Sequence, residues 1–234
     1  MIVVGTAAVV AELDCAQLSI SEVNRALRAL PEGSAVRILN PRGTHNLAVG
    51  LVQRLDITIE GNAGYYIAGL CDGPDVTVQG FVGWSVAENL MSGTVRVRGN
   101  ASESAGASSH GGLLVIEGDA SSRAGISLKG GTVCVAGDVG HMSAFMAQAG
   151  IVLVGGDAGE ALGDSLYEAV IYVGGSIRSL GADARVEELT DTDVAVVEDL
   201  CVRCGFDHIE AGNVQKVASA RQLYNFNALK DQKY

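Results

Sequence analysis

A 19-residue repeat runs through the middle of this 234-residue sequence and limits the folds that the chain can adopt. Seven successive segments align without a gap, each with apolar residues at its first and third places and glycine at its fifth. The segments begin at Ile57, Val76, Val95, Leu114, Val133, Val152 and Ile171, and their glycines are Gly61, Gly80, Gly99, Gly118, Gly137, Gly156 and Gly175. A fixed period in this range is typical of solenoids.

The pattern within each segment predicts a short strand, because apolar residues alternate with variable ones. The glycine, a residue that tolerates a positive φ, ends the strand, and a turn is expected to follow. Two apolar side chains per strand cannot bury a face alone, so the repeats must stack on a shared core. A second inward column lies six places into each segment, at Ala63, Val82, Ala101, Ala120, Val139, Ala158 and Ile177. We therefore expect an all-β fold, a single-stranded right-handed parallel β-helix with 19-residue coils.

The repeat weakens toward the N-terminus. Ile38 lies one repeat length before Ile57 and predicts a degenerate first coil. Upstream, Ser19 and Glu22 fit a capping box, which indicates a short helix that stops at Pro31. We expect residues 1–37 to form an N-terminal cap with this helix and residues 38–183 to form the β-helix.

Beyond Gly181 the repeat stops. The segment from Asp193 to Cys204 predicts a helix that ends at Gly205, and a helical turn is expected around Lys216 to Tyr224. We expect residues 184–234 to form a C-terminal helix and tail, so that short helical caps flank the β-helix at both ends.

Net charge, cysteine content and the N-terminal segment indicate the kind of partner and the cellular compartment. With a net charge of -11, the chain would be repelled by nucleic acid and by anionic membranes, which indicates protein partners. The 5 cysteines are odd in number and scattered, as expected for reduced thiols. The N-terminus lacks the basic region of a signal peptide, so a soluble, cytoplasmic protein is expected.

Three groups of residues are candidates for chemistry, and each has a structural alternative. Asp119, Asp138 and Asp157 follow column glycines and are more typical of turn stabilisation than of a cation site. His141 and Glu160 share a column, but the other histidines, His45, His110 and His208, do not join it, so surface packing is favoured over acid–base or zinc chemistry. Cys201 and Cys204 form a lone CxxC, for which packing on one helix face is favoured over a redox or cluster role.

Aromatic and apolar residues indicate an interface. Tyr65 and Trp84 share a column on neighbouring coils, with Tyr66 adjacent, and surface aromatics mark interfaces. Partial burial under the N-terminal cap is the alternative. The interface candidates are Tyr65, Tyr66, Trp84, His141, Met142, Phe145, Tyr224 and Phe226. The sequence predicts no catalytic, cofactor-binding or metal-binding residue in this chain.

Residues 35 to 185 resemble the GxGxG β-helix. That domain closes the large subunit of glutamate synthase and recurs as a separate chain in formylmethanofuran dehydrogenase and N-methylglutamate synthase. Longer strings, with the tail at residues 219–226, resemble the stand-alone β-helix subunit of N-methylglutamate synthase, also called methylamine-glutamate N-methyltransferase. These strings are Asn40-Pro-Arg-Gly43, Gly64-Tyr-Tyr-Ile-Ala-Gly69, Ala87-Glu-Asn-Leu-Met-Ser-Gly93, Gly140-His-Met-Ser-Ala-Phe-Met-Ala-Gln148 and Gly156-Asp-Ala-Gly-Glu-Ala-Leu-Gly-Asp164.

The resemblance implies a hetero-oligomer with a class II glutamine-amidotransferase-like subunit and a glutamate-synthase-like subunit that holds FMN and an iron–sulfur cluster. It implies the reaction of methylamine with glutamate to give N-methylglutamate and ammonia. This chain would hold no cofactor and would act as a structural subunit.

Two alternatives remain open. One is a β-helix subunit of another glutamate-synthase-like or formylmethanofuran-dehydrogenase-like complex. The other is a free-standing β-helix enzyme, either an acyltransferase or a polysaccharide lyase. An acyltransferase solenoid needs an aliphatic residue every six places, whereas the place twelve into each segment holds Gly69, Glu88, Ala107, Ile126, Phe145 and Asp164. A lyase would show carboxylates and arginines along one groove.

Overall fold

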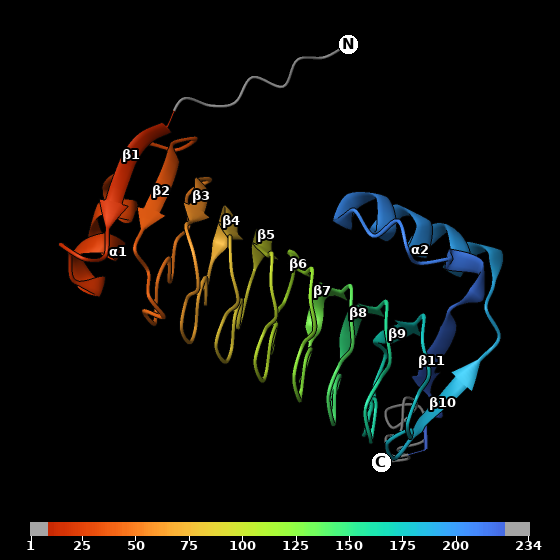
Figure 1. Ribbon diagram of the computed structural model, residues 1–234. Coiled ribbons are helices and arrows are strands. Elements are labelled where there is room, and N and C mark those ends of the chain that lie inside the picture. Colours follow the sequence, from red (N-terminus) through yellow and green to blue (C-terminus); the bar gives the residue numbers. More distant parts are fainter. Residues whose placement is uncertain (1–8, 223–234) are drawn as a thin grey trace, which may run out of the picture.

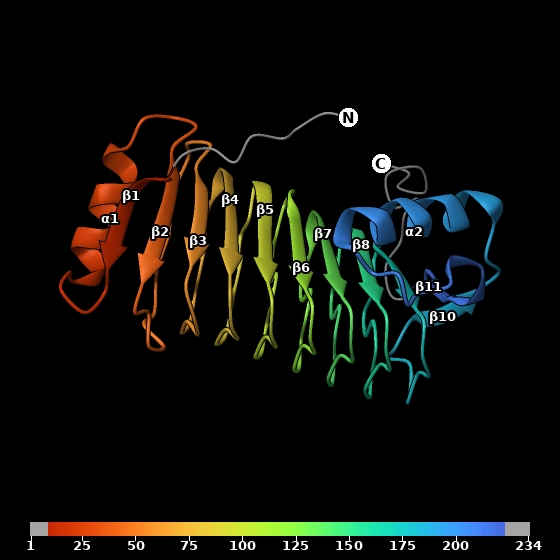
Figure 2. The same cartoon turned by 45° about the horizontal axis from the view of Figure 1, so that its top comes forward.

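The structure, a computed structural model, describes residues 9–222 and contains one continuous sheet wound into a right-handed parallel β-helix (Figures 1 and 2). Its strands follow the order β1-β2-β3-β4-β5-β6-β7-β8-β9-β11-β10. The fold class predicted from the repeat is therefore confirmed. The elements are β1 (Val9–Asp14), α1 (Ile20–Ala29), β2 (Ala35–Leu39), β3 (Asp56–Ile59), β4 (Asp72–Val78), β5 (Ser92–Val97), β6 (Leu113–Ile116), β7 (Lys129–Val135), β8 (Ala149–Val154), β9 (Val170–Val173), β10 (Ala184–Glu187), α2 (Asp191–Cys204), the 3-10 helix η1 (Ala211–Asn213) and β11 (Gln215–Ser219).

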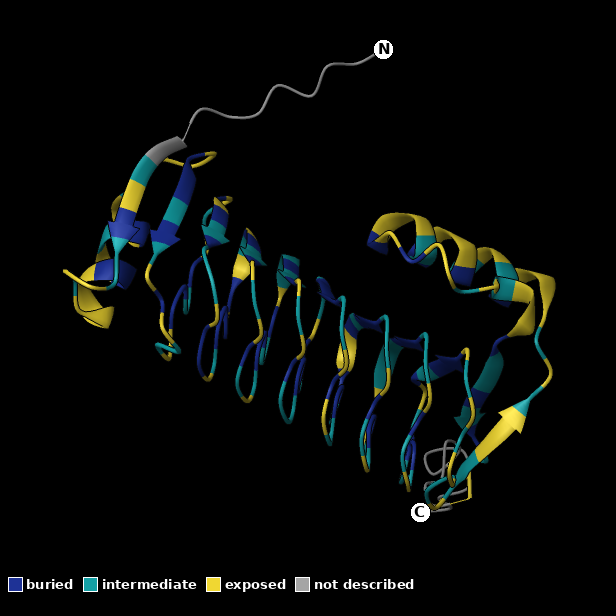
Figure 3. Cartoon of the chain, viewed as in Figure 1, coloured by how far each residue is buried: buried dark blue, intermediate teal, exposed yellow. Residues whose placement is uncertain are grey.

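The coils from β3 to β9 stack in the predicted register. Ile57 lies beside Val76, Val76 beside Val95, and the same step continues to Ile171. The second predicted column forms a ladder of isolated bridges from Val82 to Ile177. Figure 3 shows the buried residues in dark blue along the strands of the solenoid. Both inward columns of the repeat therefore line the core.

Most of the column glycines are required by space rather than by backbone conformation. Among the seven, only Gly61 has a positive φ, of 129°, so the other six do not use the positive φ that glycine tolerates. A Cβ on Gly137 would overlap with Oδ1 of Asp119 on the preceding coil. That oxygen accepts a hydrogen bond from the N–H of Asp138 at 2.9 Å. At Gly80, Gly118, Gly137, Gly156 and Gly175, glycine is needed because an Asx side chain of the preceding coil fills the space beside it.

Positive φ angles occur instead in a third wall of each coil, formed by residues 66–70 and their equivalents, which the sequence did not predict. Tyr66, Ala68 and Leu70 have φ of 60°, 54° and 58°. The N–H of Tyr66 donates to the carbonyl of Trp84 on the next coil at 2.8 Å, and that of Ala68 donates to Leu47 on the preceding coil at 3.0 Å. Alternating amide directions satisfy backbone groups on both sides, which holds this unusual conformation in place.

The first coil is longer than predicted. Val36 lies beside Ile57 and Ile38 beside Ile59, so the strand offset exceeds the repeat length by two positions. Along the third wall, the N–H of Asn46 in the first coil donates to the carbonyl of Tyr65 in the second. The equivalent bond one coil later joins the N–H of Tyr66 to the carbonyl of Trp84. Along this wall, the spacing between equivalent residues of the first and second coils therefore exceeds the repeat length by one position. The first coil has one extra residue in the turn before the wall and one in the turn after it.

Helix α1 closes the N-terminal end of the core. Its capping box between Ser19 and Glu22 forms as predicted, and the helix ends at Ala29, just before Pro31. The Asn24 side chain donates to the carbonyl of Asn46 at 2.7 Å and accepts from the N–H of Val49 at 3.3 Å. These bonds replace the coil that would otherwise pair with the third wall at its open end.

Helix α2 follows the solenoid and ends at Gly205, whose φ is 77°, as predicted. It lies along the outside of the strands rather than across the last coil (Figures 1 and 2). Its buried side chains pack on outward-facing residues of β6 to β9, namely Leu113, Val115, Cys134, Leu153 and Tyr172. A helix of 14 residues is about 21 Å long, which matches roughly four spacings of about 4.8 Å between coils.

The last coil is covered by strands. Strand β11 pairs antiparallel with β9, and β10 pairs antiparallel with β11. The predicted helical turn from Lys216 is therefore wrong within the described residues. Val217 of β11 is buried in the core. Because β11 pairs with β9, it covers the strand edge that β9 would otherwise expose. Tyr224 and Phe226 lie outside the described residues.

Across residues 9–222, neither helix combines the length and the apolar character that crossing a membrane requires. The sheet is continuous past residues 37 and 183, and the three-part division of the chain at those residues remains a prediction.

Candidate interaction site

The clearest candidate site is a row of stacked rings on the surface. The rings of His45 and Tyr65 are 4.3 Å apart at 14°, and those of Tyr65 and Trp84 are 5.1 Å apart at 11°. Tyr65 is 45% exposed and Trp84 is 50% exposed, so neither is buried under the N-terminal cap. The alternative of burial under the cap is therefore wrong, and the interface role remains a prediction.

The stack arises because its residues occupy the same place on successive coils. Since the first coil is one position longer along the third wall, His45 takes the place that Tyr65 and Trp84 take on later coils. The ring of His45 is held by its Nδ1, which accepts a hydrogen bond from the N–H of Tyr65 at 2.9 Å. The expectation that His45 lies outside this column is wrong, because the extra residue in the first coil shifts its register. We call this row, with its later members Glu103, Ser122, His141 and Glu160, the edge column.

Tyr66 does not belong to the stack. Its ring lies against Gly69, where a Cβ would collide with it. Burial raises the pKa of the Tyr66 hydroxyl, and the charge of Glu88 raises it further. Tyr66 is therefore adjacent to the stack without joining it, and its interface role remains a prediction.

A groove of about 850 Å³ opens beside the stacked rings. Tyr65, Phe81 and Trp84 form its apolar sides, and small residues of the following coils, including Ser102 and Ser121, line it as well. Phe81 is 54% exposed and occupies the place that asparagine or aspartate holds on most other coils. It was missed because a single aromatic residue in that column gives no repeating signal.

The other predicted interface residues within the described part of the chain, His141, Met142 and Phe145, lie further along the solenoid. His141 is exposed, and Met142 and Phe145 are half-buried on the same coil. Glu160 follows His141 in the edge column, but its carboxylate pairs with Arg178 at 3.1 Å. The geometry therefore does not support an acid–base pair between His141 and Glu160.

The aspartate column stabilises the turns, which is the role that the sequence favoured. Oδ1 of Asp119 accepts the N–H of Asp138 at 2.9 Å, and Oδ1 of Asp138 accepts the N–H of Asp157 at 2.7 Å. The backbone N–H of Ser176 holds the pKa of Asp157 below its usual value. The bonds join successive coils, whereas turn residues commonly bond within their own turn. Within residues 9–222, no three histidine, cysteine, aspartate or glutamate side chains are grouped as metal ligands.

Cys201 and Cys204 lie on the inner side of α2, in agreement with the packing interpretation. Cys204 is buried against Cys134 of β7. The hydrogen bond with Cys204, together with burial, raises the pKa of the Cys134 thiol. The five cysteines are free thiols. Cys201 and Cys204 therefore contribute to the contact between helix and sheet.

Two polar contacts, neither of them predicted from the sequence, fix the ends of α2. At its C-terminus, the guanidinium of Arg96 donates to the carbonyls of Cys204 at 2.9 Å and Arg203 at 3.2 Å. At its N-terminus, Asp193 accepts from the hydroxyl of Tyr172 at 2.7 Å and from Nζ of Lys216 at 2.9 Å. The positive charge of Arg96 and the negative charge of Asp193 each lie at the end of the helix where the helix dipole favours them.

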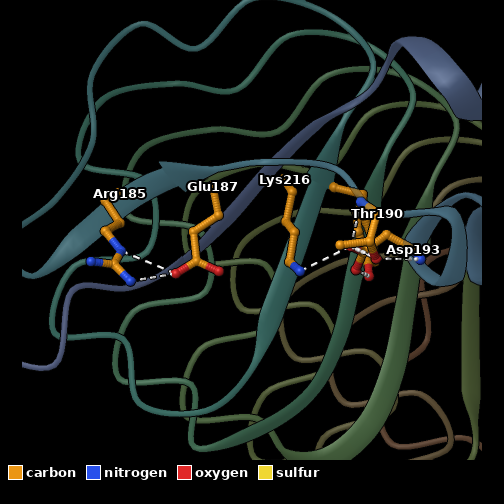
Figure 4. A network of polar contacts seen from close by, with 6 residues as sticks. Arg185, Glu187, Thr190, Asp193 and Lys216 are labelled. Carbon is orange, nitrogen blue, oxygen red and sulfur yellow. Dashed lines mark hydrogen bonds and ion pairs between the residues drawn. The ribbon is translucent and has the colours of Figure 1, made fainter.

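Figure 4 shows the second of these networks, with Lys216 and Thr190 directed at the carboxylate of Asp193. Burial by itself raises the pKa of this carboxyl, but hydrogen bonds from Thr190, Tyr172 and Lys216 outweigh it and hold the pKa well below its usual range. Every partner of Asp193 is part of the fold, so the network anchors α2 to β9 and β11.

Comparison with known proteins gives one partial similarity. No protein-family model matches the sequence. Over 64 residues the chain is 46% identical to protein GlxC of Rhizobium meliloti (strain 1021). This stretch covers 26% of this chain and 28% of that protein, so the similarity is confined to about a quarter of each.

Proposed function

We propose that this chain is a non-catalytic structural subunit of N-methylglutamate synthase, an enzyme complex that converts methylamine and glutamate into N-methylglutamate and ammonia. Its role is to position an amidotransferase-like subunit and a subunit that carries FMN and an iron–sulfur cluster. The observation that carries the proposal is a rigid, regular solenoid with stacked aromatic side chains exposed on one edge. The resemblance of its longer motifs to the β-helix subunit and the partial similarity to GlxC support the assignment.

Rigidity follows from the bonds between coils. Each coil is joined to the next by a parallel strand pair, by the bonds of the third wall and, on most coils, by an Asx side chain. Eight spacings of about 4.8 Å separate β1 from β9, so partners bound at the two ends would be held roughly 38 Å apart. A spacer of fixed length suits the transfer of a reactive amine between two sites.

The polar side chains support a structural role. Asp119, Asp138 and Asp157 each direct an oxygen at the backbone of the next coil, and Asp193 is enclosed by hydrogen bonds. The buried thiols of Cys134 and Cys204 pack between helix and sheet, an arrangement that does not fit the four thiolates of an iron–sulfur cluster. We therefore assign FMN and the cluster to a partner subunit.

The test is purification of the tagged chain from its native host, followed by identification of its partners and an assay for N-methylglutamate. We expect an amidotransferase-like protein and a flavin- and iron-containing protein in fixed ratio, with activity only when this chain is present. Co-purification with formylmethanofuran-dehydrogenase-like subunits would favour the alternative complex. Turnover by the chain alone would refute the proposal.

A further inference from the structure

The edge column contains one glutamate with a partner and one without. The N–H of Ser85 donates to the carbonyl of Glu103 at 2.9 Å, and the N–H of Met142 donates to that of Glu160 at 2.8 Å. These equivalent bonds place Glu103 and Glu160 at the same position of their coils. The two carboxylates can therefore be compared directly.

The chain supplies an arginine to Glu160 but not to Glu103. Arg178 reaches Glu160 from the next coil, and its N–H donates to Ala158. The residue that makes the equivalent backbone bond, to Ala101, on the coil after Glu103 is Ser121. Ser121 is small and lines the groove beside the rings. Within residues 9–222, the Glu103 carboxylate forms no hydrogen bond or ion pair.

An aromatic face lies on the coil before this unpaired carboxylate, at the preceding place in the edge column. One face of the Trp84 ring stacks on Tyr65, with the ring planes only 11° apart. The opposite face is directed toward the coil of Glu103, which has no ring in the edge column, and Trp84 is half exposed. Arg98 also lines the groove, and its guanidinium is held toward Glu117, whose carboxylate it shares with Arg96.

An aromatic face and a free carboxylate one coil apart attract a planar cation. The guanidinium of arginine stacks on indole rings and pairs with carboxylates through two parallel hydrogen bonds, whereas the ammonium of lysine is a strongly hydrated point charge. The net charge of -11 also attracts a basic surface at long range. Exposed aromatic residues that accept an arginine are characteristic of the strongest contacts in protein interfaces.

We propose that the exposed surface formed by Trp84 and Glu103, on successive coils of the edge column, binds an arginine side chain of a partner protein. The arginine stacks on Trp84 and pairs with Glu103, as Arg178 pairs with Glu160 within the chain. This inference rests on the proposed function, since it identifies the contact by which this chain binds a neighbouring subunit.

The partner residue can be found by crosslinking. A photoreactive amino acid at position 121 of the full chain, incorporated in the native host, should crosslink to a partner peptide that contains an arginine. The variant Glu103→Arg should weaken the complex, and changing the crosslinked arginine of the partner to glutamate should restore it. Crosslinks that form only with a second copy of this chain, or with a peptide lacking arginine, would overturn the inference.

Matched variants measure the contribution of the site. We expect Glu103→Gln and Trp84→Leu each to lower the association constant with the purified partner about tenfold. Ser121→Arg should do the same, because the new arginine would occupy the site from within the chain. Glu160→Gln, the same change in the same column, should leave the association constant unchanged.

Thermal unfolding of each variant separates lost binding from lost folding. If folded Glu103→Gln binds as well as Glu160→Gln, the inference is wrong. The proposed function would still stand, provided that the unaltered chain purifies with its catalytic partners.

Discussion

At the scale of single residues, the turns combine glycine with an Asx side chain from the coil before. A Cβ on Gly118 would overlap with Oδ1 of Asn100, just as a Cβ on Gly137 would overlap with Oδ1 of Asp119. The oxygen is held there because it accepts a backbone N–H of the next coil. At these turns glycine therefore leaves the space that the Asx side chain of the preceding coil occupies.

Replacement of Gly137 by alanine tests this dependence. We expect Gly137→Ala to lower the free energy of unfolding by about 1–3 kcal/mol in urea titrations, because the added methyl group displaces Asp119. Adding Asp119→Ala should relieve the overlap, so the double variant should be more stable than the sum of both single effects predicts. Gly212→Ala is the control, because no atom lies within 4 Å of the added Cβ. Equal effects at positions 137 and 212 would contradict the steric explanation.

At the scale of elements, α2 is positioned by one side of the sheet and by contacts at its two ends. Its inner face contacts apolar residues on the outside of β6 to β9, whereas the equivalent outward positions of β2 to β5 are Arg37, Thr58, Thr77 and Arg96. Arg96 bonds the last turn of the helix, and Asp193 bonds the first. The helix therefore stops where the sheet surface becomes polar.

The Asp193 network predicts a specific dependence on pH. The folded-state pKa of this carboxyl lies below its unfolded value of about 3.9, so its stabilisation is present above that pH and is lost as the pH falls toward the folded-state pKa. We expect Asp193→Asn to lower the free energy of unfolding by about 2 kcal/mol at pH 7. The difference from the unaltered protein should shrink below about pH 4.

Urea titrations at several pH values measure this difference. Asp191→Asn is the matched control, since Asp191 is an exposed aspartate in the same first turn. A difference for Asp193→Asn that stays constant down to pH 2, or one equal to that of the control, would show that the ionised network does not stabilise the fold.

At the scale of the whole molecule, the coils are nearly interchangeable units. Strands β3 to β9 pair in one register at the repeat positions, with shifts only at the starts of the β4–β5 and β7–β8 pairs, and each coil contacts mainly the coils before and after it. The stability of such a solenoid is approximately a sum over coils and the interfaces between them. The helix and strands at the two ends cover what would otherwise be open coils.

Removal of one full coil should therefore leave a folded protein. Deleting residues 57–75 joins Asp56 to Val76, so that Asp56 takes the place of Asp75 and the register continues. We expect a soluble protein with the circular dichroism of a β-helix and a lower melting temperature, because one interface is lost. Deleting only residues 57–66 removes half of a coil and should give insoluble protein. If both deletions are equally insoluble, the coils are not independent units.

The sequence by itself determined the solenoid and both helices. Contacts between residues one repeat length apart recur on every coil, so their side-chain columns are visible as a repeat. The capping box at Ser19 is equally local, and Gly205 ends its helix within one turn. The capping box at Thr190 was not predicted, and α2 begins at Asp191 rather than at the expected Asp193. Stacked aromatic residues at Tyr65 and Trp84 followed from the same period.

The tertiary structure alone decided the features that do not recur. Arg96 and Cys204 are 108 residues apart in sequence and meet once, so no period reveals that α2 returns along the sheet. His45 joins the edge column only because the first coil contains extra residues, which a strict count of the repeat misplaces. Whether a glutamate of the edge column is paired also depends on one residue of the next coil. That residue is Arg178 for Glu160 and Ser121 for Glu103. Repeated contacts appear in the sequence as a pattern, whereas a contact made once is fixed only when the chain packs.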